Sequence, residues 1–164
     1  MDDLKITPAA NEPAVIISRT LNAPRALVWK AMSQPEHLVR WWGPDGYKNV
    51  ITRFDWYVGG GYRIETHLPD GKVIVFHGEY LELIAPELSV QTFGVEGMYD
   101  GQMATDTATL EDLGNRTLYT IVSNLGTTEA RDGMLASGME LGVRQGLLRL
   151  DQILIELARA PQNA

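Results

Sequence analysis

The fold is decided by the last long apolar stretch of the chain, residues 132–159, which reads DGMLASGMELGVRQGLLRLDQILIELAR. Apolar residues recur in it at steps of three and four, and this spacing places them along one side of a helix. The stripe consists of Leu135, Met139, Val143, Leu147, Leu150, Leu154 and Leu157. The pattern predicts one long helix that buries this stripe against a core.

Three glycines also fall four residues apart in the first half of this stretch, at Gly138, Gly142 and Gly146. Residues at that spacing lie above one another on one helix face. Each glycine costs a helix interior about 1 kcal/mol relative to alanine, so helix stability does not explain them. Two interpretations stay open: the glycines let another segment pack closely, or they leave a hollow face beside a cavity.

Composition excludes several classes of protein. The chain has 164 residues, 45% of them hydrophobic and 21% charged, which is typical of one globular domain. Its net charge of −7 argues against nucleic acid or an anionic membrane as a partner. The absence of cysteine excludes disulfides and thiolate chemistry. The polar first 13 residues lack the apolar centre of a signal peptide, and no run is long enough to span a bilayer, so we expect a cytoplasmic protein.

The order of the expected elements indicates an α+β fold. We expect residues 1–13 to form a flexible tail and residues 14–160 to form a single domain. β-Branched residues predict a strand at 14–21, and cap and proline signals predict short helices at 25–33 and 36–41. Further strands are predicted at 47–56, 62–68, 73–84, 88–93, 102–111 and 116–124. Short connections between these strands imply an antiparallel sheet of six to seven strands, with the helices on one side.

Alternation along the strands assigns their faces. The turn Pro69-Asp70-Gly71 should pair Ile64 with Phe76 and Thr66 with Ile74. The residues expected to face the helix are Tyr62, Ile64, Thr66, Ile74, Phe76, Gly78 and Tyr80.

Asp106 is the unusual member of a later strand, because it shares a face with Leu110. An inward aspartate needs a partner, and Tyr119 or Gln91 is a candidate. The alternatives are an ordinary hydrogen-bonded pair in the core, or a register slip that places Asp106 in water.

No catalytic or metal-binding constellation stands out. The serines Ser123 and Ser137 and the three histidines show no spacing typical of a nucleophile and its base. His77 and Glu79 share a face, but two ligands do not make a metal site. We therefore predict no metal and no cofactor. Gly59-Gly60-Gly61 lacks the lysine of a phosphate loop and indicates a bulge or a close backbone approach.

Several short motifs together resemble a known family. They are APRALVW at 23–29, QPEHL at 34–38, WWGP at 41–44, GGGYR at 59–63, PDG at 69–71, GEYLEL at 78–83, and GME with a following glycine at 138–142. The combination resembles the bacterial single-domain branch of the family related to activators of the 90-kDa heat-shock protein ATPase, in the START-like or SRPBCC superfamily. The resemblance extends from about residue 15 to residue 157.

This resemblance implies a helix-grip fold, in which a curved antiparallel sheet wraps around a long C-terminal helix. Relatives bind lipids, sterols, polyketides or other hydrophobic molecules between sheet and helix, although fold alone does not carry function. The eukaryotic co-chaperone that names the family has a separate N-terminal domain, for which we expect no room before residue 15. We therefore favour a small-molecule ligand over a chaperone partner.

Two positions depart from the family pattern. Many relatives carry tryptophan at the position of Val143, so the smaller side chain predicts a larger cavity here. Asp106 stands where relatives usually have an apolar residue, and it indicates a polar feature in the pocket or a local change of register.

The leading hypothesis is a cofactor-free protein that binds a small hydrophobic molecule between sheet and C-terminal helix. The residues expected to line its cavity are Trp42, Tyr62, Ile64, Phe76, Gln91, Met103, Asp106, Tyr119, Met139, Val143 and Gly146.

Three further expectations stay open. The resemblance implies, as one alternative, a polyketide cyclase- or aromatase-like enzyme, with Asp106 as acid or base and Tyr119 orienting the substrate. Alternatively, the protein is a chaperone-accessory interaction module. Either form is compatible with a homodimer through an edge strand or an exposed apolar rim.

Overall fold

A computed structural model describes residues 3–97 and 103–160 of the chain. Eight strands form one antiparallel sheet in the order β1-β2-β8-β7-β6-β5-β4-β3. Their bounds are Lys5–Pro8 (β1), Ala14–Leu21 (β2), Lys48–Phe54 (β3), Gly61–His67 (β4), Val73–Ile84 (β5), Leu88–Val95 (β6), Ala104–Asp112 (β7) and Thr117–Asn124 (β8). The predicted α+β class is confirmed.

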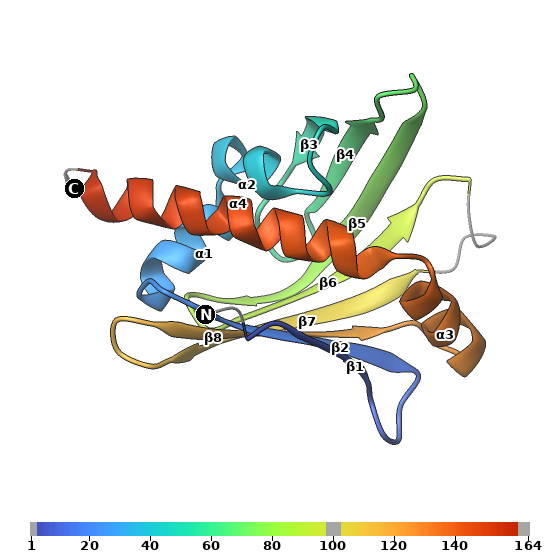
Figure 1. Cartoon of the computed structure of the whole chain (residues 1–164), viewed down its shortest axis with the longest axis horizontal. Helices are drawn as coiled ribbons and strands as arrows, with labels where there is room; N and C mark the ends of the chain where they lie inside the picture. The colour runs from blue at the N-terminus through green and yellow to red at the C-terminus, as the bar shows by residue number, and fades with distance from the viewer. Residues whose placement is uncertain (1–2, 98–102, 161–164) are drawn as a thin grey trace.

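Four helices are described: α1 (Arg25–Ser33), α2 (Pro35–Trp41), α3 (Thr128–Ala136) and α4 (Met139–Arg159). Figure 1 shows α4 lying across one face of the curved sheet, with α1 and α2 on the same side. This arrangement is the helix-grip fold that the sequence predicted.

The N-terminal segment is not a loose tail throughout. Residues of β1 pair with β2, with Ile6 opposite Ile17, so the sheet has eight strands rather than the six or seven expected. Asp3 adds hydrogen bonds from the main-chain nitrogen and the hydroxyl of Thr20, at 2.9 and 2.7 Å. Sequence patterning missed this strand because it is four residues long, lies at the edge of the sheet and buries little side-chain surface.

The predicted single helix over 132–159 is wrong, because Gly138 separates two helices. Gly138 has a φ of +82°, a left-handed conformation that glycine adopts without steric cost. The first helix begins earlier than predicted, at Thr128, where the Thr127 hydroxyl accepts a hydrogen bond from the nitrogen of Ala130 at 3.1 Å. Gly138 therefore does not belong to a helix face with Gly142 and Gly146.

Close packing explains the two remaining glycines of α4. A Cβ built on Gly146 would lie 2.6 Å from the carbonyl oxygen of Trp41, and one on Gly142 would lie 3.3 Å from Cγ of Pro44. The chain that follows α2 thus crosses directly over this part of α4. The alternative of a hollow glycine face is not what the structure shows.

The core consists of two apolar clusters side by side. The first cluster lies between α1, α4 and strands β2, β7 and β8, and it includes Leu21, Val28, Leu110, Leu150 and Leu154. The second cluster lies between α2 and strands β3 to β5, and it is built on Leu38, Tyr62, Ile64 and Tyr80. The predicted pairing of Ile64 with Phe76 and of Thr66 with Ile74 is confirmed.

The triple glycine is both a bulge and a close backbone approach, because Gly59, with a φ of +91°, and Gly60 together lie opposite the single residue Tyr80. The nitrogen of Gly59 donates to the carbonyl of Tyr80 at 2.9 Å, and the nitrogen of Tyr80 donates to the carbonyl of Gly60 at 3.0 Å. Two further irregular steps of the sheet lie between Ile51 and Arg53 in β3 and between Tyr80 and Glu82 in β5. This contact fixes the main chain of Tyr80.

Candidate functional site

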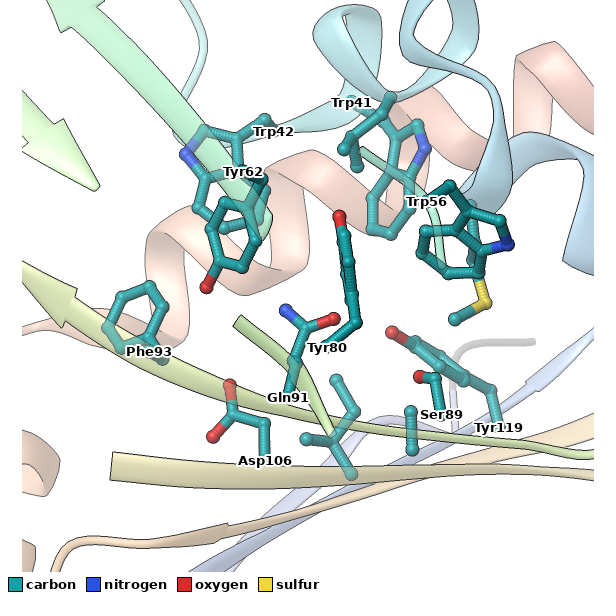
Figure 2. Close-up of a pocket in the computed structure, with 14 residues that line it drawn as sticks. Trp41, Trp42, Trp56, Tyr62, Tyr80, Ser89, Gln91, Phe93, Asp106 and Tyr119 are labelled. Carbon is teal, nitrogen blue, oxygen red and sulfur yellow. The ribbon is translucent and has the colours of Figure 1, made fainter. Parts of the chain in front are cut away.

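A cavity of about 160 Å³ lies where the two core clusters meet. Helices, strands and the segment after α2 all contribute to its wall (Figure 2). Its lining residues are Met32, Leu38, Trp41, Trp42, Trp56, Tyr62, Tyr80, Ser89, Gln91, Phe93, Asp106, Ala108, Tyr119 and Ile121.

Three neighbouring strands supply the polar side of the cavity. Gln91 of β6 is paired with Asp106 of β7, and Asp106 is paired with Ser123 of β8. Side chains paired in this way point to the same face of a sheet, so the three polar groups lie in one row. The next row along, Ser89 with Ala108 and Ile121, lines the cavity as well.

Aromatic rings form the opposite side. Trp42 contacts Tyr62 with ring centroids 6.3 Å apart, and Tyr62 contacts Tyr80 at 5.6 Å. Trp56 packs on Tyr80 at 4.7 Å in an edge-to-face arrangement. Figure 2 shows these rings, together with Trp41, around the space above Gln91.

The two tryptophans at the end of α2, Trp41 and the following Trp42, are held by hydrogen bonds to their surroundings. The indole nitrogen of Trp41 donates to the carbonyl of Ala31 at 3.1 Å, and Asn49 donates its amide to the carbonyl of Trp42 at 2.7 Å. Arg149 of α4 donates to the carbonyl oxygens of Arg40, at 3.0 Å, and of Gly43. Helix α4 therefore supports this side of the cavity wall through hydrogen bonds from the Arg149 side chain to main-chain carbonyls. None of the lining residues that the structure describes belongs to α4.

Asp106 is the one carboxyl group among the lining residues that the structure describes. Burial raises the pKa of Asp106 from 3.8 to about 6, while a hydrogen bond with Ser123 lowers it in part. Oδ1 of Asp106 is buried and has no hydrogen-bond partner in the described part of the chain. Ser123 is a partner that the sequence analysis did not consider. Tyr119, one of the two candidates, is paired with Leu110, four residues and about 13 Å along the strand.

The lining tyrosines are neutral groups at physiological pH. Burial raises the pKa of Tyr62, of Tyr80 and of Tyr119, and the charge of Asp106 adds to the rise for Tyr62 and Tyr119. The Tyr62 hydroxyl donates to the carbonyl of Thr92 at 2.8 Å. The cavity thus combines aromatic surface with neutral hydroxyl groups and one titratable carboxyl.

The structure brings five of the eleven expected residues to this cavity, namely Trp42, Tyr62, Gln91, Asp106 and Tyr119. That they contact a ligand stays a prediction. The other six lie outside the lining. Among them, Ile64 is fully buried in the second core cluster, and Phe76 packs on Trp42 with ring centroids 5.5 Å apart.

The remaining four were assigned to the cavity because of the presumed long helix and the loop before β7. Gly146 lies under the carbonyl of Trp41, Val143 packs against the first core cluster, and Met139 is the first residue of α4. Met103 is 38% exposed and lies next to Gly94. Val143 is not in the lining, and the larger cavity expected from its small size stays a prediction.

Nine lining residues were not predicted: Met32, Leu38, Trp41, Trp56, Tyr80, Ser89, Phe93, Ala108 and Ile121. Period-two alternation from Asp106 and Gln91 was a sufficient signal for Ala108, Ser89 and Phe93. No sequence pattern pointed to Trp56, because it follows β3 in a turn whose path depends on the contact between Gly60 and Tyr80.

The described residues also bear on metal and membrane sites. Within 3–97 and 103–160, no three His, Asp or Glu side chains lie close enough together to hold a metal ion. No helix in the same ranges has the length and apolar character needed to cross a bilayer.

Comparison with known proteins identifies the family. The model of the family described as "Activator of Hsp90 ATPase homolog 1-like protein" matches residues 22–155. A solution structure of a protein from Arthrobacter aurescens is 25% identical, with 98% of each chain covered and a TM-score of 0.83. Protein CV1439 from Chromobacterium violaceum is 27% identical over 85% of this chain and 96% of its own, with a TM-score of 0.74.

A third structure, Ms6760 from Mycobacterium smegmatis, shares the fold at 18% identity, with 98% of each chain covered and a TM-score of 0.82. The names of these three proteins state no ligand or activity. A search of curated proteins found no match. On the match of its family model, the chain belongs to the family of proteins like activator of Hsp90 ATPase homolog 1.

Proposed function

We propose that this protein binds a small, mainly apolar molecule in the cavity between its two core clusters. The observation that carries the proposal is a void of about 160 Å³ with aromatic walls and one buried carboxylate oxygen without a partner. Protein interiors are normally close-packed, and buried polar atoms are normally hydrogen-bonded. A site that departs from both rules is more consistent with a binding site than with an ordinary core.

The volume sets the size of the ligand. A cavity of about 150 Å³ accommodates one benzene molecule, whereas pockets for drug-sized ligands occupy about 300–1,000 Å³. The cavity of about 160 Å³ therefore fits a molecule of one ring or a short branched chain. Sterols, lipids and polyketides are larger and require the lining side chains to move.

Filling the cavity tests the proposal. Ala108 lines it and is buried, so Ala108→Ile adds three carbon atoms to the wall, and isoleucine is well tolerated in a strand. The matched control is Thr107→Ile, on the opposite face of β7. Native mass spectrometry of the purified proteins, and NMR titration with one-ring compounds, should show binding to the control and none to Ala108→Ile. Equal binding by both variants would place the site elsewhere.

Acid–base catalysis in the same cavity is the second candidate, and the observation that favours it is a pKa of about 6 at Asp106. A group with a pKa near the working pH exchanges protons efficiently with a substrate. A polyketide-sized substrate exceeds the cavity, which favours a reaction on a smaller molecule. Asp106→Asn should abolish turnover of such a substrate, whereas a protein that only binds should lose affinity at most.

The family description names activation of the Hsp90 ATPase, and this activity is a third proposal for the chain. Its test is an ATPase assay of the host's Hsp90 with and without the protein. Absence of stimulation would exclude it. We also propose a cytoplasmic location, which cell fractionation would test.

A further inference from the structure

We propose that the ligand is a small organic cation, an amine or ammonium compound with an apolar body of one ring, whose nitrogen lies at Asp106. This inference rests on the proposed binding function and names the chemical class of the ligand. It follows from the polar end of the cavity, where a buried acceptor and a group of aromatic rings come together.

The acceptor is Oδ1 of Asp106. An ionised carboxylate only accepts hydrogen bonds, and this oxygen is buried without a partner in the described residues. The ligand-sized space borders Asp106 directly, because Asp106 belongs to the lining. A ligand with an N–H donor supplies the missing partner.

Among residues 3–97 and 103–160, no cationic side chain lines the cavity to balance the charge of Asp106. Arg19 of β2 is paired with Tyr119 and so lies on the same sheet face, but it binds both carboxylate oxygens of Asp151 at 2.9 and 2.6 Å. Arg149 of α4 is bound to main-chain carbonyls and to Asp45 at 3.1 Å. An opposite charge stabilises a carboxylate that is largely shielded from water, and a cationic ligand supplies that charge.

Aromatic rings surround the same end. Trp42, Tyr62 and Phe93 lie toward Asp106 in Figure 2, whereas Trp56 and Tyr119 lie toward the other end. Trp42 contacts both Tyr62 and Phe93 with ring centroids 6.3 Å apart. The faces of aromatic rings carry negative potential and attract cations, as in sites that recognise ammonium groups.

The other ligand classes fit less well. The carboxylate and the negative ring faces repel an anion, and so does the net charge of −7 of the protein. A hydrocarbon leaves Oδ1 of Asp106 unpaired. An alcohol supplies a donor but leaves the buried charge without an opposite charge.

Four molecules of one shape test the assignment: benzylamine, benzyl alcohol, toluene and benzoate, titrated into the whole protein at pH 7.5 and followed by NMR and calorimetry. We expect benzylamine to bind at least tenfold more tightly than benzyl alcohol or toluene, and benzoate to bind least. Equal or tighter binding of the neutral compounds would overturn the cation while leaving a small-molecule site in place. Absence of binding by all four would overturn both this inference and the proposed function.

Asp106→Asn separates charge from shape. The variant should bind benzylamine no more tightly than benzyl alcohol or toluene. A preference that survives in a folded Asn variant would place the cation away from Asp106. If the variant does not fold, the comparison of the four compounds on the wild-type protein still decides the question.

The pH profile gives an independent readout. Benzylamine stays protonated from pH 5 to pH 8, so its affinity should rise as Asp106 ionises around pH 6 and level off above pH 7. Raised pKa values keep Tyr62, Tyr80 and Tyr119 neutral throughout this range. Toluene should bind independently of pH or more weakly as the pH rises. A benzylamine profile that is flat, or that falls as the pH rises, would contradict the assignment.

Discussion

Gly146 of α4 lies so close to Trp41 that a Cβ on Gly146 would be 2.6 Å from the carbonyl oxygen of Trp41. The absence of a side chain at this one position lets the C-terminal end of α2 and the residues that follow it pack directly on α4. Trp41 and Trp42 then extend from this segment into the cavity wall. Gly146 thus shapes the candidate site without lining it.

Gly146→Ala should therefore destabilise the protein by about 1–3 kcal/mol, the usual cost of overpacking, although alanine favours a helix. Gly133→Ala in α3 is the matched control, since its Cβ would have no neighbour within 4 Å. The control should gain about 0.5–1 kcal/mol. Urea unfolding measures both, and a gain in both variants would mean that the contact with Trp41 is not tight.

The sheet could be predicted from the sequence because its signals are local. Alternation and turn residues located seven of the eight strands, and the turn at Asp70-Gly71 defined the register around Ile64 and Phe76. The prediction failed at β1, whose stability comes from main-chain pairing at the sheet edge. It also failed at Gly138, because a helical repeat on both sides of a glycine does not reveal a positive φ.

The candidate site could be predicted only in part, because local sequence signals do not reveal contacts between segments that are distant in the chain. Asp106 and Gln91 were found through strand alternation. Val143 and Gly146 were expected in the lining of the cavity but lie outside it. Helix periodicity identifies a buried face but not what covers that face. The segment after α2 covers the glycine side of α4, and only the three-dimensional contact between Gly146 and Trp41 reveals this.

Arg149→Met should also weaken the attachment of residues 40–45 to α4. Its guanidinium donates to the carbonyls of Arg40 and Gly43 and pairs with Asp45. Hydrogen bonds from a charged donor contribute about 1.5–3 kcal/mol, so we expect a loss of stability of that order.

Fluorescence of the tryptophans should also become more accessible to a quencher in Arg149→Met. Arg144→Met, on the same helix, is the control, because Arg144 pairs with the exposed Glu140 one turn away at 3.2 Å. Equal quenching in the two variants would show that Arg149 does not hold the tryptophan segment.

The ion pair between Arg19 and Asp151 should matter more for stability than other arginine pairs on α4. Arg19 is 8% exposed, donates to both oxygens of Asp151 and also to the carbonyl of Leu147 at 3.3 Å. Removing one partner of a buried pair costs about 3–5 kcal/mol. Arg19→Met should show this loss in urea unfolding, with little dependence on salt.

Arg40→Met is the comparison for that experiment. Arg40 binds Glu156 in an equally short geometry, at 2.8 and 2.9 Å, but on the exposed surface. Solvent and salt screen such a pair, so its loss should be smaller and should diminish further at high ionic strength. A larger loss in Arg40→Met than in Arg19→Met would contradict the ranking by burial.

The contribution of Asp106 to the free energy of unfolding should decrease as the pH rises from about 4 to about 6. The folded state raises the pKa of Asp106 from 3.8 to about 6, so the folded protein binds more protons than the unfolded chain in this interval. Stability then decreases with pH and is constant above the folded pKa. A shift of about two units corresponds to roughly 3 kcal/mol.

Subtracting the profile of Asp106→Asn isolates this contribution. The wild-type protein should lose stability relative to the Asn variant between pH 4 and pH 6, and the difference should stay constant from pH 7 to pH 8. Urea unfolding at each pH measures it. Parallel profiles would mean that Asp106 ionises at its ordinary pKa and is in contact with water.

Ser123→Ala should raise the pKa of Asp106 above 6, because the Ser123 hydroxyl is the hydrogen-bond partner that favours the ionised carboxyl. Carbon-detected NMR of the Asp106 carboxyl follows the titration directly. Ser89→Ala is the matched control: Ser89 is as polar and is buried, but it lies in the next row, opposite Ala108. Its removal should leave the pKa of Asp106 nearly unchanged. A pKa that stays at 6 in Ser123→Ala would show that burial alone determines the titration of Asp106. A fall below 6 would mean that the Ser123 hydroxyl donates nothing to the carboxylate and instead accepts a hydrogen bond from the protonated acid.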